Sequence, residues 1–181
     1  MACFLDKIYQ AGNPFLFKIE EALYAELVSF LYPRHGIRCF DFATALTHNH
    51  SEGIKGARAV MVAAWMAGHG SSKEGIRERI DSEYYPLNFT LDSIRDTYQF
   101  DETCQGSVPQ AIEAFLESES FEDAIRNAIS IGGDSDTIAA ITGSIAEEFY
   151  SVPDEITIKA RSYLSPTLLS ILDAFEEKYP V

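Results

Sequence analysis

The stretch Gly132-Gly133-Asp134-Ser135-Asp136-Thr137-Ile138-Ala139-Ala140 carries the strongest structural and chemical signal in this chain. Two carboxylates and a hydroxyl follow a pair of glycines, and an apolar run with helical spacing comes directly after them. Carboxylate and hydroxyl oxygens are the ligands that Mg²⁺ prefers. Phosphate also binds at helix starts, because free N–H groups and the positive end of the dipole point outward there. The stretch therefore predicts a helix start that binds a divalent metal and a phosphorylated ligand.

A purely structural interpretation of these residues stays open. Asp134 or Ser135 could cap the helix, and Asp136 could complement its dipole. A single cap does not need two aspartates and a threonine after two glycines, which slightly favours the metal site.

Apolar residues recur at helical spacing along most of the chain. Helices are predicted over residues 15–32, 52–68, 72–80, 107–116 and 136–150, between Pro153 and Pro166, and over 168–179. A Ser-x-x-Asp capping box at Ser120 starts another helix, which ends at the diglycine. Residues 81–105 are predicted to form a long loop or short helices. Because no alternating strand pattern occurs, we predict a single all-α domain over residues 1–181.

Composition limits the classes of partner. The chain carries 14 basic and 28 acidic residues, a formal net charge of −14 at pH 7. This charge argues against nucleic acid or an anionic membrane as a general partner, since both require a basic surface. The three cysteines are widely spaced and form no Cys-x-x-Cys pair, which argues against a zinc site or a disulfide framework. We therefore expect a reduced, cytoplasmic protein with no signal peptide and no membrane span.

Two further segments carry candidate site residues. In the first, His48 and His50 precede a predicted helix, where they could bind a metal, contact a ligand or hydrogen-bond the backbone. The last alternative is favoured, because no cysteine or third histidine accompanies them. In the second, Cys104 is a weak candidate nucleophile and a stronger candidate for a small buried thiol. Gly106 and Ser107 follow it and could bring the backbone close to a ligand.

These segments, in this order, resemble the ADP-ribosylglycohydrolase family over about residues 44–150, and residues 1–39 stay unmatched. The resemblance is carried by Thr47-His48-Asn49-His50-Ser51-Glu52-Gly53-Ile54-Lys55-Gly56-Ala57-Arg58-Ala59, by Cys104-Gln105-Gly106-Ser107-Val108-Pro109-Gln110-Ala111-Ile112 and, above all, by Ile131-Gly132-Gly133-Asp134-Ser135-Asp136-Thr137-Ile138-Ala139-Ala140-Ile141.

The resemblance implies a compact orthogonal bundle of helices with two Mg²⁺ or Mn²⁺ ions at the base of a cleft. It implies hydrolysis of the bond that joins ADP-ribose to a protein side chain or a related acceptor. Carried over residue by residue, the metal ligands would be Asp134, Asp136 and Thr137. The ligand-binding residues would be His50, Gly106, Ser107, Gly132, Gly133 and Ser135.

The chain also departs from the family pattern. The family takes further metal ligands from a Thr-Asp-Asp segment in its N-terminal half, and no two aspartates are adjacent in this chain. We therefore expect a domain that lacks the N-terminal part of its metal site, with no catalytic residue assigned. It would be an incomplete or weak hydrolase alone, completed by a second chain or by its own dimer. The alternative is a non-catalytic module that binds ADP-ribose or a nucleotide, or a structural remnant.

Overall fold

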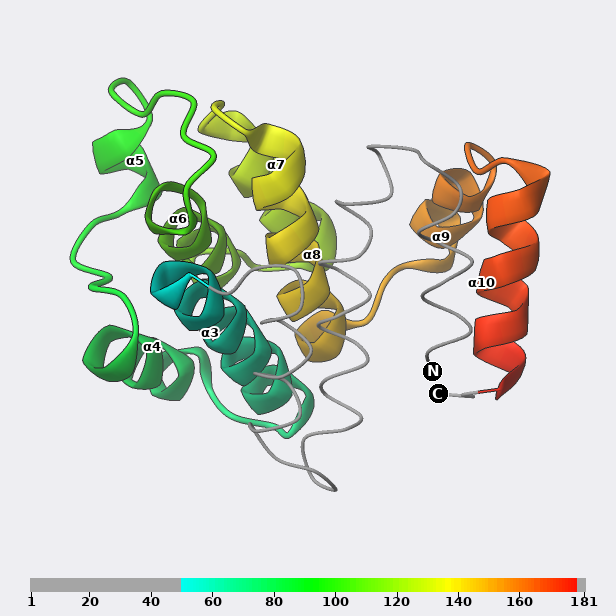
Figure 1. Cartoon of the computed structure of the whole chain (residues 1–181), viewed down its shortest axis with the longest axis horizontal. Helices are drawn as coiled ribbons and strands as arrows, with labels where there is room; N and C mark the ends of the chain where they lie inside the picture. Colours follow the sequence, from blue (N-terminus) through cyan, green and yellow to red (C-terminus); the bar gives the residue numbers. More distant parts are fainter. Residues whose placement is uncertain (1–49, 179–181) are drawn as a thin grey trace. The chain divides into compact units, whose positions relative to one another are not determined.

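The structure, a computed structural model, describes residues 50–178. Within this range the chain forms eight α-helices and no β-strand, which confirms the all-α prediction (Figure 1). The helix predicted over residues 15–32 lies outside the described residues. Contacts divide the chain into two compact units, with the boundary between Tyr150 and Ser151, and each unit is described by itself. None of the described helices combines the length and the apolar composition needed to span a bilayer.

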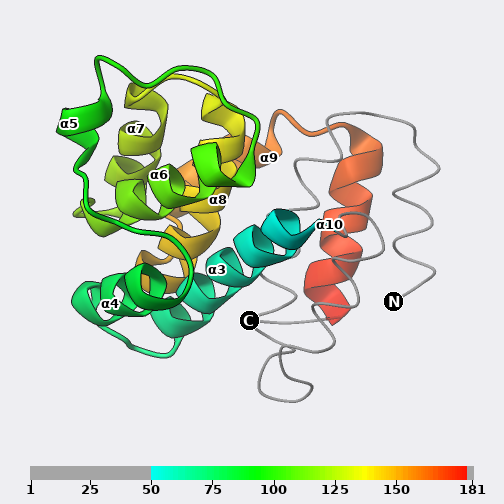
Figure 2. The same cartoon turned by 60° about the vertical axis from the view of Figure 1, so that its left-hand side comes forward.

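Among the described residues of the first unit, four helices pack against one another, and two more pack on the outside of this group. Helices α3, α6, α7 and α8 form the packed group, α4 lies against α3, and α5 lies against α6 (Figures 1 and 2). Their bounds are α3 Ser51–Gly68, α4 Lys73–Glu83, α5 Leu91–Ile94, α6 Cys104–Leu116, α7 Phe121–Ser130 and α8 Ser135–Tyr150.

Helix α6 is enclosed by the others. From Gly106 to Leu116 every residue except Gln110 is buried. A helix that is apolar on all sides must be surrounded, because no face of it is suited to water. Small residues on α3 face this core, and their lack of bulk permits close packing: Ala59, Ala63 and Ala64 are fully buried.

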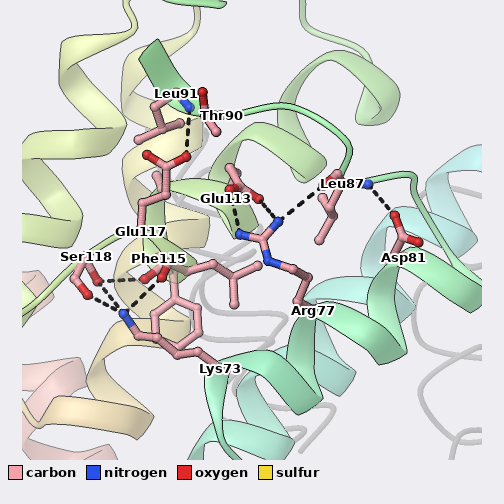
Figure 3. Close-up of polar contacts among 12 residues, drawn as sticks. Lys73, Arg77, Asp81, Leu87, Thr90, Leu91, Glu113, Phe115, Glu117 and Ser118 are labelled. Atoms are coloured by element: carbon pink, nitrogen blue, oxygen red, sulfur yellow. Dashed lines mark hydrogen bonds and ion pairs between the residues drawn. The ribbon is translucent and has the colours of Figure 1, made fainter. Parts of the chain in front are cut away.

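One charge is buried within α6. Glu113 is 1% exposed, and Arg77 of α4 donates to both of its carboxylate oxygens at 2.8 and 2.7 Å (Figure 3). Arg77 also donates to the carbonyl of Leu87 at 3.2 Å. Burial raises the pKa of Glu113, whereas the hydrogen bonds from Arg77 act in the opposite direction. The two-pronged contact compensates a carboxylate that would otherwise be costly to bury.

A second cation lies at the C-terminal end of α6. Lys73 donates to the carbonyls of Leu116, at 3.2 Å, and of Ser118 (Figure 3). The last carbonyls of a helix lack intrahelical partners and carry the negative end of its dipole, so an ammonium is favourable there. The same ammonium lies over three aromatic rings, those of Phe115, Phe149 and Tyr150, at 5.1, 5.8 and 5.3 Å.

The helix boundaries match most predictions. Helix α3 ends at Gly68 as predicted, α4 continues to Glu83, and α8 begins at Ser135. The predicted start of α6 at Ser107 is wrong, because this helix begins at Cys104. The Thr103 side chain accepts from the Gly106 amide and caps the helix there, which leaves Pro109 inside it.

The predicted capping box of α7 is confirmed in one half. The Ser120 hydroxyl accepts from the amide of Asp123 at 3.2 Å, as the motif requires. The Asp123 carboxylate accepts from the amide of Glu119 at 2.9 Å. The reciprocal bond therefore reaches one residue farther back than the motif describes.

The described residues of the second unit form two helices, α9 (Asp154–Arg161) and α10 (Pro166–Lys178). Helix α9 lies between Pro153 and Pro166 as predicted, and α10 begins two residues before its predicted start at Leu168. Arg161 of α9 donates to Glu176, at 2.7 Å, and to Asp173, both on α10. Neither helix contains a buried residue.

We expect the Glu113→Ala variant to lower the free energy of unfolding by about 2 to 3 kcal/mol, because Arg77 loses its buried partner while staying partly hydrated. The matched control is Glu122→Ala, which breaks an exposed pair with Arg126 within α7. That variant is expected to lose less than about 0.5 kcal/mol. Urea denaturation of both variants measures the difference. Equal losses would show that the buried pair does not stabilise the fold.

Candidate functional site

The predicted site lies in the turn between α7 and α8. Gly132 and Gly133 have φ angles of +74° and +68°, so two consecutive residues adopt the left-handed conformation. Residues other than glycine adopt this left-handed backbone conformation only with strain, which explains why two glycines occupy the turn. The carbonyl of Asp134 accepts from the Ile138 amide at 3.0 Å and opens α8. Asp136 lies in the first turn of that helix.

The predicted metal ligands sit side by side at this helix start. Asp134 and Thr137 are half-buried, and Asp136 is exposed. Asp134 and Asp136 each make contacts within the chain. Carboxylates at this end of α8 are favoured by the helix dipole whether or not an ion is bound.

Tyr98 connects this turn to the start of α6. A Cβ placed on Gly133 would lie 2.3 Å from Cε1 of the Tyr98 ring, so the ring and the glycine are in tight contact. The Tyr98 hydroxyl donates to the carbonyl of Gly106 at 2.6 Å. Burial raises the pKa of Tyr98, and the carboxylates of Asp101 and Asp134 raise it further, so the hydroxyl stays a donor at neutral pH. The structure thus brings Gly106 and the diglycine turn to one side chain.

Ser107 and His50, the other predicted ligand-binding residues, have local partners. The Ser107 hydroxyl is directed to the carbonyls of Asp101 and Thr103, each at 2.9 Å, and the residue is 3% exposed. The His50 side chain caps α3, because its Nδ1 accepts from the Glu52 amide at 3.3 Å. This agrees with the backbone-bonding alternative for His50. No described contact links it to the diglycine turn, and His48 lies outside the described residues.

Cys104 belongs to a cluster between α3 and α6. A Cβ on Gly56 would lie 3.0 Å from Cβ of Cys104, 3.1 Å from its Sγ and 3.4 Å from the Tyr85 hydroxyl. Tyr85 is 3% exposed, and burial raises the pKa of its hydroxyl. Lys55 lies 4.3 Å from the centre of the Tyr85 ring. Cys104 itself is only half-buried, so the prediction of a buried thiol holds in part.

The candidate ligands carry the type of donor atom that a divalent cation binds, but there are only three of them. Asp134, Asp136 and Thr137 offer the hard oxygen atoms that Mg²⁺ and Mn²⁺ prefer. Among residues 50–178, no group of three or more histidine, cysteine, aspartate or glutamate side chains is placed to hold a metal ion. A cation with only these three donors would keep most of its water shell.

Comparison with known protein families decides the ancestry of this arrangement. The sequence pattern of the ADP-ribosylglycohydrolase family matches residues 22–147, well over half of the chain. The chain belongs to the ADP-ribosylglycohydrolase family. Comparisons with curated proteins and with solved structures found no match.

The matched range of this ADP-ribosylglycohydrolase family member includes most of the described helices. It covers α3 to α7 and nearly all of α8, including the diglycine turn and both segments that Tyr98 joins. It begins at residue 22, so it takes in part of the segment that the motifs alone left unmatched. Helices α9 and α10 lie beyond it.

Tyr98, Asp101 and Thr103 contact Gly106 or Ser107 of the candidate site and were not singled out from the sequence. They lie in the aperiodic segment 81–105, where no hydrophobic pattern guides interpretation. Thr103 had a recognisable signal, since a threonine three residues before a glycine amide can cap a helix. Tyr98 had no local sequence signal, because it contacts a turn that lies more than 30 residues farther along the chain.

We expect Gly133→Ala to destabilise the protein more than Gly132→Ala. At Gly132 an added Cβ meets nothing within 4 Å, so only the strain of the positive φ remains, about 1 kcal/mol. At Gly133 the Cβ also collides with the Tyr98 ring, and the loss should exceed about 2 kcal/mol. Chemical denaturation measures both. Gly75→Ala, inside α4 and without a close contact, serves as the control and should not destabilise. A Gly133→Ala loss no larger than that of Gly132→Ala would contradict the tight contact.

Proposed function

We propose that this protein is a metal-dependent hydrolase that releases ADP-ribose from modified protein side chains or related conjugates. The observation that carries the proposal is the gathering of Asp134, Asp136 and Thr137 at the start of α8, directly after two left-handed glycines, in a chain of the ADP-ribosylglycohydrolase family. Packing alone requires none of the three polar side chains, since the core face of α8 is made by Ile138, Ile141 and Ile145.

In this proposal, Asp134, Asp136 and Thr137 hold Mg²⁺ or Mn²⁺, two ions in the complete site. The described residues supply too few oxygen donors, so the remaining ligands come from outside residues 50–178, from a second chain, or from a second copy of this one. The ion, when bound, supplies Lewis-acid polarisation and orients a water molecule.

The substrate's diphosphate and ribose are assigned to the residues around the turn. Gly132, Gly133 and Ser135 lie beside the positive end of α8, which favours an anionic group. Gly106 and Ser107 line the start of α6, next to the Tyr98 hydroxyl. Because the chain has a net charge of −14, a bound cation would also reduce the repulsion of a diphosphate.

We assign His50 to the same ligand through its ring, whose Nδ1 also caps α3. We place the protein in the cytoplasm, consistent with its three scattered cysteines. Its partners would be ADP-ribose and ADP-ribosylated protein, without nucleic acid or membrane.

A second candidate function is binding of ADP-ribose or a nucleotide without turnover. The short donor set of the described residues favours it, because weak metal binding permits ligand capture but hinders catalysis. Release of ADP-ribose from an ADP-ribosylated protein separates the two functions, since only the hydrolase produces it.

Calorimetric titration of ADP-ribose into the full chain, first with Mg²⁺ and then with EDTA, tests the proposal. We expect binding with Mg²⁺ and its loss with EDTA. Asp136→Ala should weaken binding at least about tenfold, because it removes an oxygen donor. Circular dichroism should show a folded variant, since a first-turn aspartate contributes only about 1 kcal/mol to helix stability.

The matched control is Asp154→Ala, because Asp154 also lies in the first turn of a helix, α9, but does not follow a diglycine. Its affinity should equal that of the unaltered chain. Binding that is insensitive to both EDTA and Asp136→Ala would contradict a metal site at the start of α8.

A further inference from the structure

The diglycine turn is held at its two ends by backbone hydrogen bonds, from the Gly132 amide to the Ile129 carbonyl at 3.1 Å and from the Ile138 amide to the Asp134 carbonyl at 3.0 Å. Gly132 and Gly133 are both exposed, and neither has a side chain that could pack. Glycine also has the greatest backbone freedom of any residue. A functional side chain must nevertheless be held to within about half an ångström to act. A restraint on Gly133 from outside the turn would therefore add to the contacts that Asp134, the first candidate ligand, already makes within the chain.

Tyr98 provides such a restraint through two different parts of its side chain. The ring edge presses on Gly133, where an added Cβ would lie 2.3 Å from Cε1 and 3.1 Å from Cδ1. The hydroxyl, at the far end, donates to the Gly106 carbonyl at 2.6 Å. The rigid ring thus spans the distance between the turn and the start of α6.

The backbone of Tyr98 is itself fixed. Its amide donates to the carbonyl of Ile94 at 2.7 Å, so the loop continues directly from α5. The amide of Leu91 donates to the Glu117 carboxylate at 2.9 Å, which ties the start of α5 to the end of α6. Arg95 donates to the hydroxyl of Ser130, the last residue of α7. The segment that carries Tyr98 is therefore attached to the end of α6 and to the last residue of α7, just before the diglycine turn.

We propose that Tyr98 is a positioning residue, which holds the diglycine turn, and with it Asp134, at a fixed distance from the start of α6. The proposal rests on the proposed function where it concerns ligand binding. Tyr98 need not touch the substrate. The ring fixes Gly133 by contact, and the hydroxyl fixes the angle of the ring, so the ring makes the larger contribution.

Three variants separate positioning from general stability. Tyr98→Leu removes the rigid ring, and Tyr98→Phe keeps the ring but removes the hydrogen bond to Gly106. Phe89→Leu is the matched control, because Phe89 is a partly buried aromatic residue in the loop before α5 and packs against the core. It has no described contact with the diglycine turn.

The first readout is backbone order of the full chain without ligand, measured by ¹⁵N relaxation at the amides of Gly133, Asp134 and Ser135. We expect order parameters near 0.85 in the unaltered protein and below about 0.6 in Tyr98→Leu. Tyr98→Phe should stay close to the unaltered value of about 0.85, and so should Phe89→Leu. An unchanged order parameter in Tyr98→Leu, or an equal fall in Phe89→Leu, would overturn the proposal.

The second readout is the affinity for ADP-ribose in the presence of Mg²⁺. Tyr98→Leu should weaken it about tenfold, Tyr98→Phe less than about threefold, and Phe89→Leu not at all. If the turn loses order but affinity is unchanged, the link from Tyr98 to the ligand is refuted. If the unaltered chain binds no ADP-ribose, the proposed function fails, and the order parameters alone decide whether Tyr98 positions the turn.

Discussion

The architecture depends on the burial of α6 on every side. A helix without a polar face can form only inside a shell of other elements, so α3, α7 and α8 must pack on it before it is stable. Polar atoms are tolerated there only with partners. Glu113 receives Arg77, and the terminal carbonyls receive Lys73 (Figure 3). Both cations come from α4, so this helix contributes Ile76 and Ile80 to the apolar core and also supplies the positive charges that pair with α6.

The two ends of α6 serve different purposes. At its C-terminal end, Lys73, three aromatic rings and Glu117 fasten α4, α5 and α8 together. At its N-terminal end, Thr103 caps the helix and Gly106 receives the Tyr98 hydroxyl. The contacts at the N-terminal end of α6 involve loop residues and a glycine rather than packed side chains. The N-terminal end of α6, which faces the candidate site through Tyr98, is therefore fixed by backbone hydrogen bonds, whereas its C-terminal end is fixed by packed side chains.

Much of this arrangement was predictable from local sequence, and the rest was not, for physical reasons. Helices α3 and α8 follow from apolar periodicity, and Ser120 marks the start of α7, because such signals act over one or two turns. Asp134, Asp136 and Thr137 could be grouped because they are neighbours in the chain. The start of α6 was missed because a proline was taken as its first turn, while Thr103 capped it earlier. Arg77 and Glu113 are 36 residues apart, and nothing in either segment identifies the other. Tyr98 is a similar case, since its contact with Gly133 exists only after α7 and α8 have packed.

The ion pair between Arg77 and Glu113 has a geometric consequence besides stability. The hydrophobic effect is not directional, so an apolar helix could pack in the core at many rotations about its own axis. A carboxylate gripped by a planar guanidinium removes that freedom, because only one rotation of α6 points Glu113 at α4. Gly106 lies about two turns before Glu113 and so shares its azimuth on the helix. The buried pair therefore sets the angular phase of α6, and through it the direction in which the Gly106 carbonyl faces Tyr98.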